Sequence, residues 1–152
     1  MYETIMQAAL KIVSRRRRTV LEMRGKLFEK FPGEDVVIEK VLVRLLEMKY
    51  LDDYSYVQAF ARDRLKFRPR GKKMIEFELK RKGVDAATAA RGLADLEIDE
   101  VETARKIFAL YKKKSSFKRA KNQRASVFRY LASRGISFAA AQRVVTESRI
   151  ED

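Results

Sequence analysis

The sequence contains neither cysteine nor histidine. Without cysteine, the chain has no disulfide, no thiolate nucleophile and no cysteine-ligated zinc or iron–sulfur site. Without histidine, it lacks the Ser-His and Cys-His catalytic pairs and the commonest protein ligand of transition metals. We therefore expect a protein without catalytic residues, metal or cofactor.

Glycine, proline and long apolar runs are also scarce. Six glycines and two prolines in 152 residues favour long helices over a many-turned β architecture. No apolar stretch approaches the roughly 18 residues that suggest a membrane span, and the first residues, Met1–Thr4, lack the layout of a signal peptide. These features predict an all-helical, soluble protein of the cytoplasm that has no membrane partner.

The positive charge is concentrated in the last third of the chain. The whole sequence carries a net charge of +14, and residues 101–152 contain 13 basic but only 4 acidic side chains. No acidic residue occurs between Glu102 and Glu147. Solvated helices usually mix charges of both signs to gain ion pairs one turn apart. An acid-free stretch therefore indicates a polyanionic partner, which could be nucleic acid, an acidic protein face or a membrane surface. The membrane surface is disfavoured, because the apolar helix stripes are accounted for by packing within the protein.

An internal repeat runs through the chain with a spacing of about 52 residues. Leu79–Val84 and Leu131–Ile136 share the pattern Leu-x-x-basic-Gly-β-branched, and a third copy begins at Leu27, where the glycine is missing and Phe31 takes the apolar position. The alignment extends to both sides through three sets of apolar residues: Met23, Ile75 and Val127; Val37, Ala89 and Ala141; Val41, Leu93 and Val145.

Each repeat has the pattern of a three-helix module. The first helices carry apolar stripes with helical spacing, the second helices end at the glycine, and the third helices begin at residues that favour helix N-caps, Asp35, Asp85 and Ser137. Stacked modules share interfaces, so we predict an all-α fold of three tandem three-helix repeats in an elongated, curved solenoid. The predicted repeats span 1–50, 51–98 and 99–152; the alternative is a single globular helical bundle.

The residues of these repeats resemble the RecX family. Arg15–Leu27 resembles that family's first-repeat signature, an Arg-rich turn followed by Glu-Leu-Arg-x-Lys-Leu, with methionine in place of the leucine. The resemblance continues through Tyr50–Asp53, Arg70–Gly71 and Lys82–Val84, and it ends with Arg129–Ile136. It covers almost the whole chain in the same order, and it departs from the family in the missing glycine of the first repeat and the short N-terminus.

The resemblance implies a regulator of the RecA recombinase. Members of that family contact the RecA–single-stranded DNA filament along its groove and generally inhibit strand exchange, ATP hydrolysis and the co-protease activity of the SOS response in DNA repair. The resemblance brings no catalytic residue and no cofactor. Its implied partners are the RecA filament and single-stranded DNA, with double-stranded DNA as a further candidate, and we expect the protein to be a monomer.

The candidate binding residues lie where the first helix of each repeat meets the second. If the repeats stack as a solenoid, equivalent junctions share one edge, and guanidinium groups there can pair with phosphates or carboxylates. The candidates are Arg15, Arg16, Arg17 and Arg18 in the first junction, Lys66, Arg68, Arg70, Lys72 and Lys73 in the second, and Lys112, Lys113, Lys114, Lys118, Arg119, Lys121 and Arg124 in the third.

Three smaller interpretations accompany these candidates. Asp52 and Asp53 could bind Mg²⁺ as paired carboxylates, but a helix N-cap near Tyr54 is the better interpretation. Phe67 is expected to pack in the core rather than to stack on bases. The alternative to a RecA regulator is an autonomous protein that binds nucleic acid without sequence preference.

Overall fold

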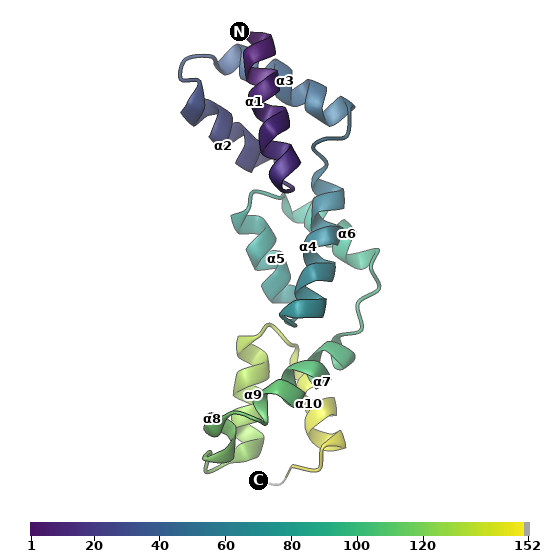
Figure 1. The fold of residues 1–152 in the computed structure, drawn as a ribbon. Coiled ribbons are helices and arrows are strands. Elements are labelled where there is room, and N and C mark those ends of the chain that lie inside the picture. The colour runs from purple at the N-terminus through teal and green to yellow at the C-terminus, as the bar shows by residue number, and fades with distance from the viewer. Residues whose placement is uncertain (151–152) are drawn as a thin grey trace. The chain divides into compact units, whose positions relative to one another are not determined.

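The computed structural model describes residues 1–150, and this part of the chain contains helices and no strand (Figure 1). The three-repeat, all-helical fold predicted from the sequence is confirmed. The helices are α1 (Tyr2–Arg15), α2 (Val20–Lys30), α3 (Asp35–Glu47), α4 (Asp53–Phe67), α5 (Lys72–Arg81), α6 (Ala86–Ala94), α7 (Glu100–Tyr111), α8 (Ser115–Lys118), α9 (Gln123–Ser133) and α10 (Phe138–Glu147).

The residues aligned by the repeat occupy equivalent places in the core. Leu27, Leu79 and Leu131 lie on α2, α5 and α9 and are each completely buried. The other aligned apolar residues are buried as well, except for the half-buried Val37. The spacing of 52 residues therefore corresponds to a repeated packing position rather than to a coincidence of helical periodicity.

The chain packs into two compact units. The first comprises Met1–Ala59 and Leu79–Gly92, and the second comprises Phe60–Glu78 and the described residues from Leu93 onward. The divisions fall within α4, α5 and α6, so the second repeat contributes to both units. The repeat boundaries at residues 50 and 98 and the elongated, curved shape remain predictions.

Two of the second helices end as their glycines predict. Gly83 and Gly135 have φ angles of 93° and 80°, a left-handed conformation that costs glycine little. Behind α5, the N–H groups of Gly83 and Val84 donate to the carbonyls of Lys80 and Leu79. The same pair of bonds occurs behind α9, and together they form the Schellman motif that satisfies the last carbonyls of a helix.

The first repeat ends its second helix differently. Phe31 is half-buried against the core of the first unit, as its aligned position predicts. The left-handed residue is Gly33, with φ 82°, which follows Pro32. The first repeat therefore keeps a glycine in its turn, although at a position that the alignment does not reveal.

The predicted N-caps of the third helices are correct in two repeats of three. Asp85 accepts a hydrogen bond from the N–H of Thr88 at 2.8 Å, and Ser137 accepts one from Ala140 at 3.3 Å. The prediction for Asp35 was wrong, because Asp35 is already the first residue of α3. Glu34 holds the cap position without a side-chain bond, and the Asp35 carboxylate favours the helix start through the helix dipole instead.

The two adjacent aspartates at the start of α4 have different roles. Asp52 caps the helix by accepting from the N–H of Ser55 at 3.2 Å. Asp53 accepts from the N–H of Val20 at 3.0 Å, which ties the start of α4 to the start of α2. Burial raises the pKa of Asp53, and the bond from Val20 opposes that rise. This pair is therefore structural, as the preferred interpretation of the sequence held.

Equivalent residues of successive repeats donate a hydrogen bond to equivalent carbonyl oxygens, and we call this contact the repeat joint. In the first unit, the Thr19 hydroxyl donates to the carbonyl oxygen of Lys82 at 2.6 Å. In the second unit, the Gly71 N–H donates to the carbonyl oxygen of Arg134, also at 2.6 Å. Thr19 and Gly71 are 52 residues apart, as are Lys82 and Arg134. Each joint thus connects the start of one repeat's second helix to the turn after the next repeat's second helix.

We expect Thr19→Val to lower the free energy of unfolding by about 2 kcal/mol. Thr19 is completely buried, and its hydroxyl both makes the joint and caps α2 by accepting from the N–H of Glu22 at 3.1 Å. Valine keeps the shape and removes both bonds. Urea denaturation followed by circular dichroism measures the change. Ser137→Ala, which removes a cap alone, should cost about 1 kcal/mol; an equal loss in the two variants would contradict a role for the joint.

Candidate anion-binding surfaces

The first candidate cluster lies at the end of α1. Arg15 occupies the last turn of that helix, and Arg16 and Arg17 follow it in an exposed turn. Arg18 is half-buried, and its Nε has no hydrogen-bond partner within the described residues. Three of the four guanidinium groups are thus open to an anion, while Arg18 lies partly against the first unit.

The second cluster is divided by an internal ion pair. Arg70 donates from Nη1 to Glu78 at 2.7 Å, and Arg64 donates to the other oxygen of the same carboxylate at 3.3 Å. Arg70 therefore shares one carboxylate with Arg64, and its Nη1 is engaged within the second unit. Lys72 is half-buried, whereas Lys66, Arg68 and Lys73 are exposed and present the net positive charge of this junction.

Phe67 does not pack in the core, so the prediction of a buried Phe67 was wrong. Its side chain is 66% exposed at the end of α4, just before the turn through Pro69. The ammonium group of Lys66 lies 5.2 Å from the centroid of its ring. The last residue of a helix can point past its neighbours, and sequence spacing alone does not show this.

The third cluster surrounds a short helix that the sequence did not predict. Helix α8 lies within the basic stretch, and Phe117 anchors it through edge-to-face contacts with Phe108 and Tyr111 at 5.9 and 5.5 Å. Arg124 is half-buried, with its guanidinium 5.5 Å from the Phe128 ring. The remaining candidates of this cluster are exposed: Lys112, Lys113, Lys114, Lys118, Arg119 and Lys121.

Glu102 and Glu147, the acidic residues at the two ends of the acid-free stretch, both pair with Arg105, and Glu147 also lies 3.5 Å from Arg143. Arg105 donates to Glu102 at 2.9 Å and to Glu147 at 2.7 Å. The hydrogen bonds from Arg105 hold the pKa of Glu147 below its ordinary value. These two carboxylates are therefore already paired with Arg105.

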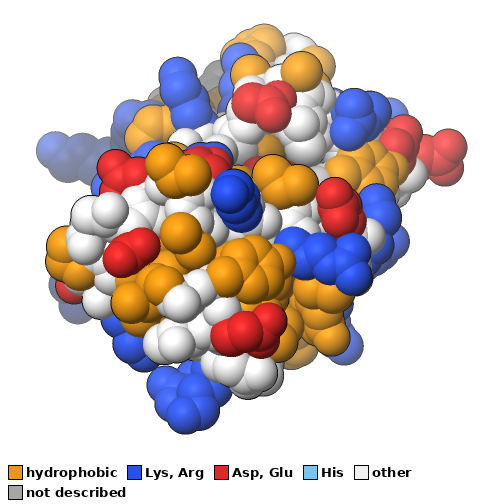
Figure 2. Space-filling view, turned by 90° about the horizontal axis from the view of Figure 1, so that it is seen from above, with side chains coloured by type: hydrophobic (Ala, Val, Ile, Leu, Met, Phe, Trp, Pro, Cys, Tyr) orange, Lys and Arg blue, Asp and Glu red, His pale blue; other side chains and the backbone are white. Residues whose placement is uncertain are grey.

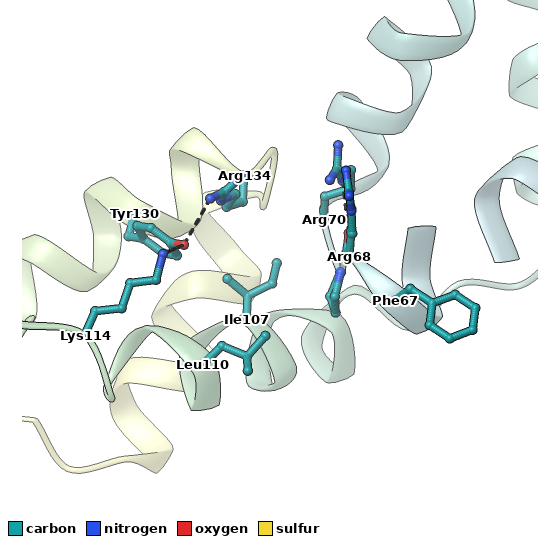
Figure 3. Close-up of a pocket in the computed structure, with 9 residues that line it drawn as sticks. Phe67, Arg68, Arg70, Ile107, Leu110, Lys114, Tyr130 and Arg134 are labelled. Carbon is teal, nitrogen blue, oxygen red and sulfur yellow. Dashed lines mark hydrogen bonds between the residues drawn. The ribbon is translucent and has the colours of Figure 1, made fainter. Parts of the chain in front are cut away.

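A groove in the second unit brings the second and third clusters together (Figure 3). It has a volume of about 480 Å³ and contains Arg68 and Arg70 from the second cluster and Lys114 from the third. We call it the basic groove. No carboxylate lines it, and its full lining is Phe67, Arg68, Pro69, Arg70, Ile107, Leu110, Lys114, Tyr130 and Arg134.

Two cations of the basic groove are hydrogen-bonded to Tyr130. Arg134 and Lys114 point toward its hydroxyl and donate to it at 3.1 and 3.3 Å, while its ring stacks on Tyr111 at a centroid distance of 4.0 Å (Figure 3). Burial raises the pKa of Tyr130, but the two charged donors outweigh burial and bring the pKa below its ordinary value. Because both cations occupy the phenol oxygen as donors, the phenol proton can be donated to a bound anion.

Sequence reasoning did not select Tyr130 and Arg134 as site residues. Arg134 was interpreted only as the basic residue before the glycine that ends the second helix. The signal that could have found the pair is their spacing, since residues i and i+4 of a helix share one face. Aromatic and guanidinium groups on one face, in an acid-free segment, indicate a surface for anions.

Hydrophobic side chains also reach the surface. Val36 is 70% exposed on α3, and Leu110 is 55% exposed beside the basic groove. On the face seen in Figure 2, hydrophobic side chains reach the surface between Lys, Arg, Asp and Glu side chains. A partner that meets such surfaces can make apolar contacts in addition to ionic ones.

The described part of the chain contains neither a membrane-spanning helix nor a metal-binding group of side chains. None of its helices has both the length and the apolar character needed to cross a bilayer. Among the same residues, His, Cys, Asp and Glu side chains form no group of three or more that could hold a metal ion.

These observations define a tandem three-helix-repeat protein with basic clusters and a basic groove. Residues 52–93 match the family model described as RecX, second three-helix domain. The chain belongs to the RecX family, because it matches this model and is similar over most of its length to proteins named RecX.

Several relatives bear the name Regulatory protein RecX. The protein of Leuconostoc mesenteroides is 32% identical over an alignment of 149 positions, which covers 92% of this chain and 54% of the relative. That of Clostridium perfringens strain 13 is 33% identical over an alignment of 143 positions, which covers 91% of this chain and 65% of the relative. The chain thus spans between about half and two thirds of the length of these two proteins.

Solved structures show the same fold. RecX from Lactobacillus salivarius superposes with a TM-score of 0.80 over 99% of this chain and 97% of that chain, at 24% sequence identity. A second structure of regulatory protein RecX gives a TM-score of 0.78 over 95% of this chain and 71% of that one, at 20% identity.

Proposed function

We propose that this protein regulates the RecA recombinase by binding the RecA–single-stranded DNA filament through its basic clusters. In this proposal it acts in the cytoplasm as a monomer, by binding rather than by catalysis. Its effect is to inhibit strand exchange, ATP hydrolysis and the co-protease activity of RecA. Family membership supports the regulatory role, and the distribution of charge supports the mode of binding.

The observation that carries the proposal is the basic groove together with the exposed lysines beside it. Arg68, Lys114 and Arg134 line one concave surface that has apolar walls at Ile107 and Leu110. The third cluster continues outside the groove with Lys112 and Lys113, which are exposed. A groove with both cations and apolar walls suits a partner that contains protein as well as nucleic acid. Phosphates can pair with the cations, but only apolar groups of a protein can pack against the apolar walls.

The second candidate function is autonomous nucleic-acid binding without sequence preference. The acid-free stretch favours it, because Lys and Arg that neutralise phosphates release counterions and bind any sequence. Log affinity should then fall linearly with log salt concentration. The two functions overlap, since a filament ligand can touch both RecA and DNA.

ATP hydrolysis by RecA on single-stranded DNA, with this protein titrated in, tests the proposal. We expect the wild type to lower the rate and Arg68→Glu to require at least about fivefold more protein for the same effect. Arg62→Glu is the matched control, since Arg62 is exposed on α4 and lies outside the groove. Equal potency of the two variants would remove the basic groove from the interface, and no change of rate with the wild type would reject RecA regulation.

A further inference from the structure

A stacked pair of aromatic rings lies on the surface of the third repeat, apart from the basic groove. The rings of Phe128 on α9 and Phe138 at the start of α10 have centroids 5.3 Å apart and an interplanar angle of 19°. Phe138 is 69% exposed, among the most exposed of the large hydrophobic side chains. The guanidinium of Arg124 lies 5.5 Å from the centroid of the Phe128 ring. We call these three residues the aromatic platform.

The aromatic platform is separate from the basic groove although both use α9. Phe128 and Tyr130 are two residues apart, so their side chains leave the helix about 200° from each other. Arg124 and Phe128 are four residues apart and share a face. The platform also lies within the stretch from Glu102 to Glu147 that has no acidic residue. Helix α9 thus contributes to the basic groove with one face and to the aromatic platform with the opposite face.

We propose that the aromatic platform binds the bases of single-stranded nucleic acid, with the outer base stacked on Phe138 and Arg124 beside the chain of phosphates. An exposed aromatic face attracts a base because stacking removes both faces from water, and every base has such a face. The positive charge of the surrounding stretch complements a phosphate backbone and opposes a basic partner. A duplex offers no such contact, since its bases are already stacked.

This contact adds to the proposed function a direct interaction with bases and does not require the recombinase. Base stacking on the platform predicts two results that phosphate binding alone does not predict. Affinity contributed by the platform should discriminate single strands from duplexes, and it should persist at salt concentrations that weaken phosphate contacts.

The sequence contains no tryptophan, so Phe138→Trp places a single indole on the platform. With an oligothymidylate of about 20 nucleotides, we expect the indole fluorescence to be quenched as the strand binds, and to change little with a duplex of equal length. Binding is followed independently by the anisotropy of a labelled strand. A strand that binds without changing the indole emission, or a duplex that quenches it equally, overturns the proposal.

A second pair of variants measures the energetic contribution. Phe138→Ala should weaken binding of the single strand about tenfold and leave duplex binding within a factor of two. Phe77→Ala is the matched control, because Phe77 is 61% exposed on α5 and lies outside the platform. Circular dichroism checks that both variants remain folded. If Phe138→Ala weakens both forms of DNA equally, or binds single strands as the wild type does, base stacking at Phe138 is rejected.

The outcome can be separated from that of the RecA proposal. The fluorescence measurement contains no RecA, so it can succeed while the effect on ATP hydrolysis fails. An effect on ATP hydrolysis that is preserved in Phe138→Ala, with unchanged binding of single strands, rejects the platform and leaves RecA regulation standing.

Discussion

Reversing the charge of Lys112, Lys113, Lys114, Lys118 and Arg119 should remove most of this protein's effect on ATP hydrolysis by RecA. All five side chains are exposed, and α8, which lies among them in the sequence, is held by Phe117. The fold should therefore remain intact in the variant. A site built for a polyanion loses its attraction and gains repulsion at the same time, so we expect the required protein concentration to rise at least about a hundredfold.

The control is a variant with the same change of net charge in the first unit. Lys11, Lys26, Lys30, Lys40 and Lys49 are five exposed lysines outside the candidate clusters. Their reversal should weaken the effect by less than about tenfold, through the long-range field alone. If both variants lose activity equally, net charge rather than the third cluster determines binding.

We expect Gly71→Ala to destabilise the second unit by about 3 kcal/mol or more. A Cβ atom at position 71 would run into the backbone carbonyl of Gly135, which cannot move aside as a flexible side chain can. The N–H of Gly71 also donates to the carbonyl oxygen of Arg134 at the repeat joint. A backbone shift that relieves the clash would therefore break a buried hydrogen bond. Urea denaturation and hydrogen exchange at α9 and α10 measure the loss.

Gly25→Ala is the control, and we expect it to stabilise the protein. Gly25 lies within α2, and a Cβ atom there would meet nothing within 4 Å. Alanine should raise the free energy of unfolding by about 0.5 to 1 kcal/mol, since glycine is unfavourable inside a helix. A loss of stability in both variants, or in neither, would contradict the close approach of the chain at Gly71.

The repeated fold could be predicted because its signals are local. The glycines that end α5 and α9 and the capping residues Asp85 and Ser137 act within a few positions of their own helix, and the structure confirms them. The apolar residues at a spacing of 52 are buried for the same reason, because each faces its own module. Local rules misplaced two features of the first repeat. The left-handed turn residue is Gly33 rather than a residue at the aligned position, and Asp35 is the first residue of α3 rather than its N-cap.

The basic groove could not be predicted in the same way, because it depends on contacts far apart in sequence. The repeat joint brings Arg134 next to Gly71, so that Arg68 lines the same groove as Arg134, while Lys114 reaches Tyr130 because α7 packs against α9. Nothing in the spacing of basic residues shows that Arg70 is engaged by Glu78 while Arg68 is exposed. The exposure of Phe67 also depends on where α4 ends, which sequence fixes only within a few residues.

The order of addition in a RecA ATPase measurement tests the central proposal most directly. RecA is first assembled on single-stranded DNA until every DNA site is occupied, and this protein is then added, with and without excess single-stranded DNA. A regulator that binds the filament should lower the rate of ATP hydrolysis by preformed filaments and retain part of its effect when excess DNA competes. Preformed filaments that hydrolyse ATP at an unchanged rate, together with complete loss of the effect in excess DNA, would show a competitor for DNA and contradict regulation of the filament.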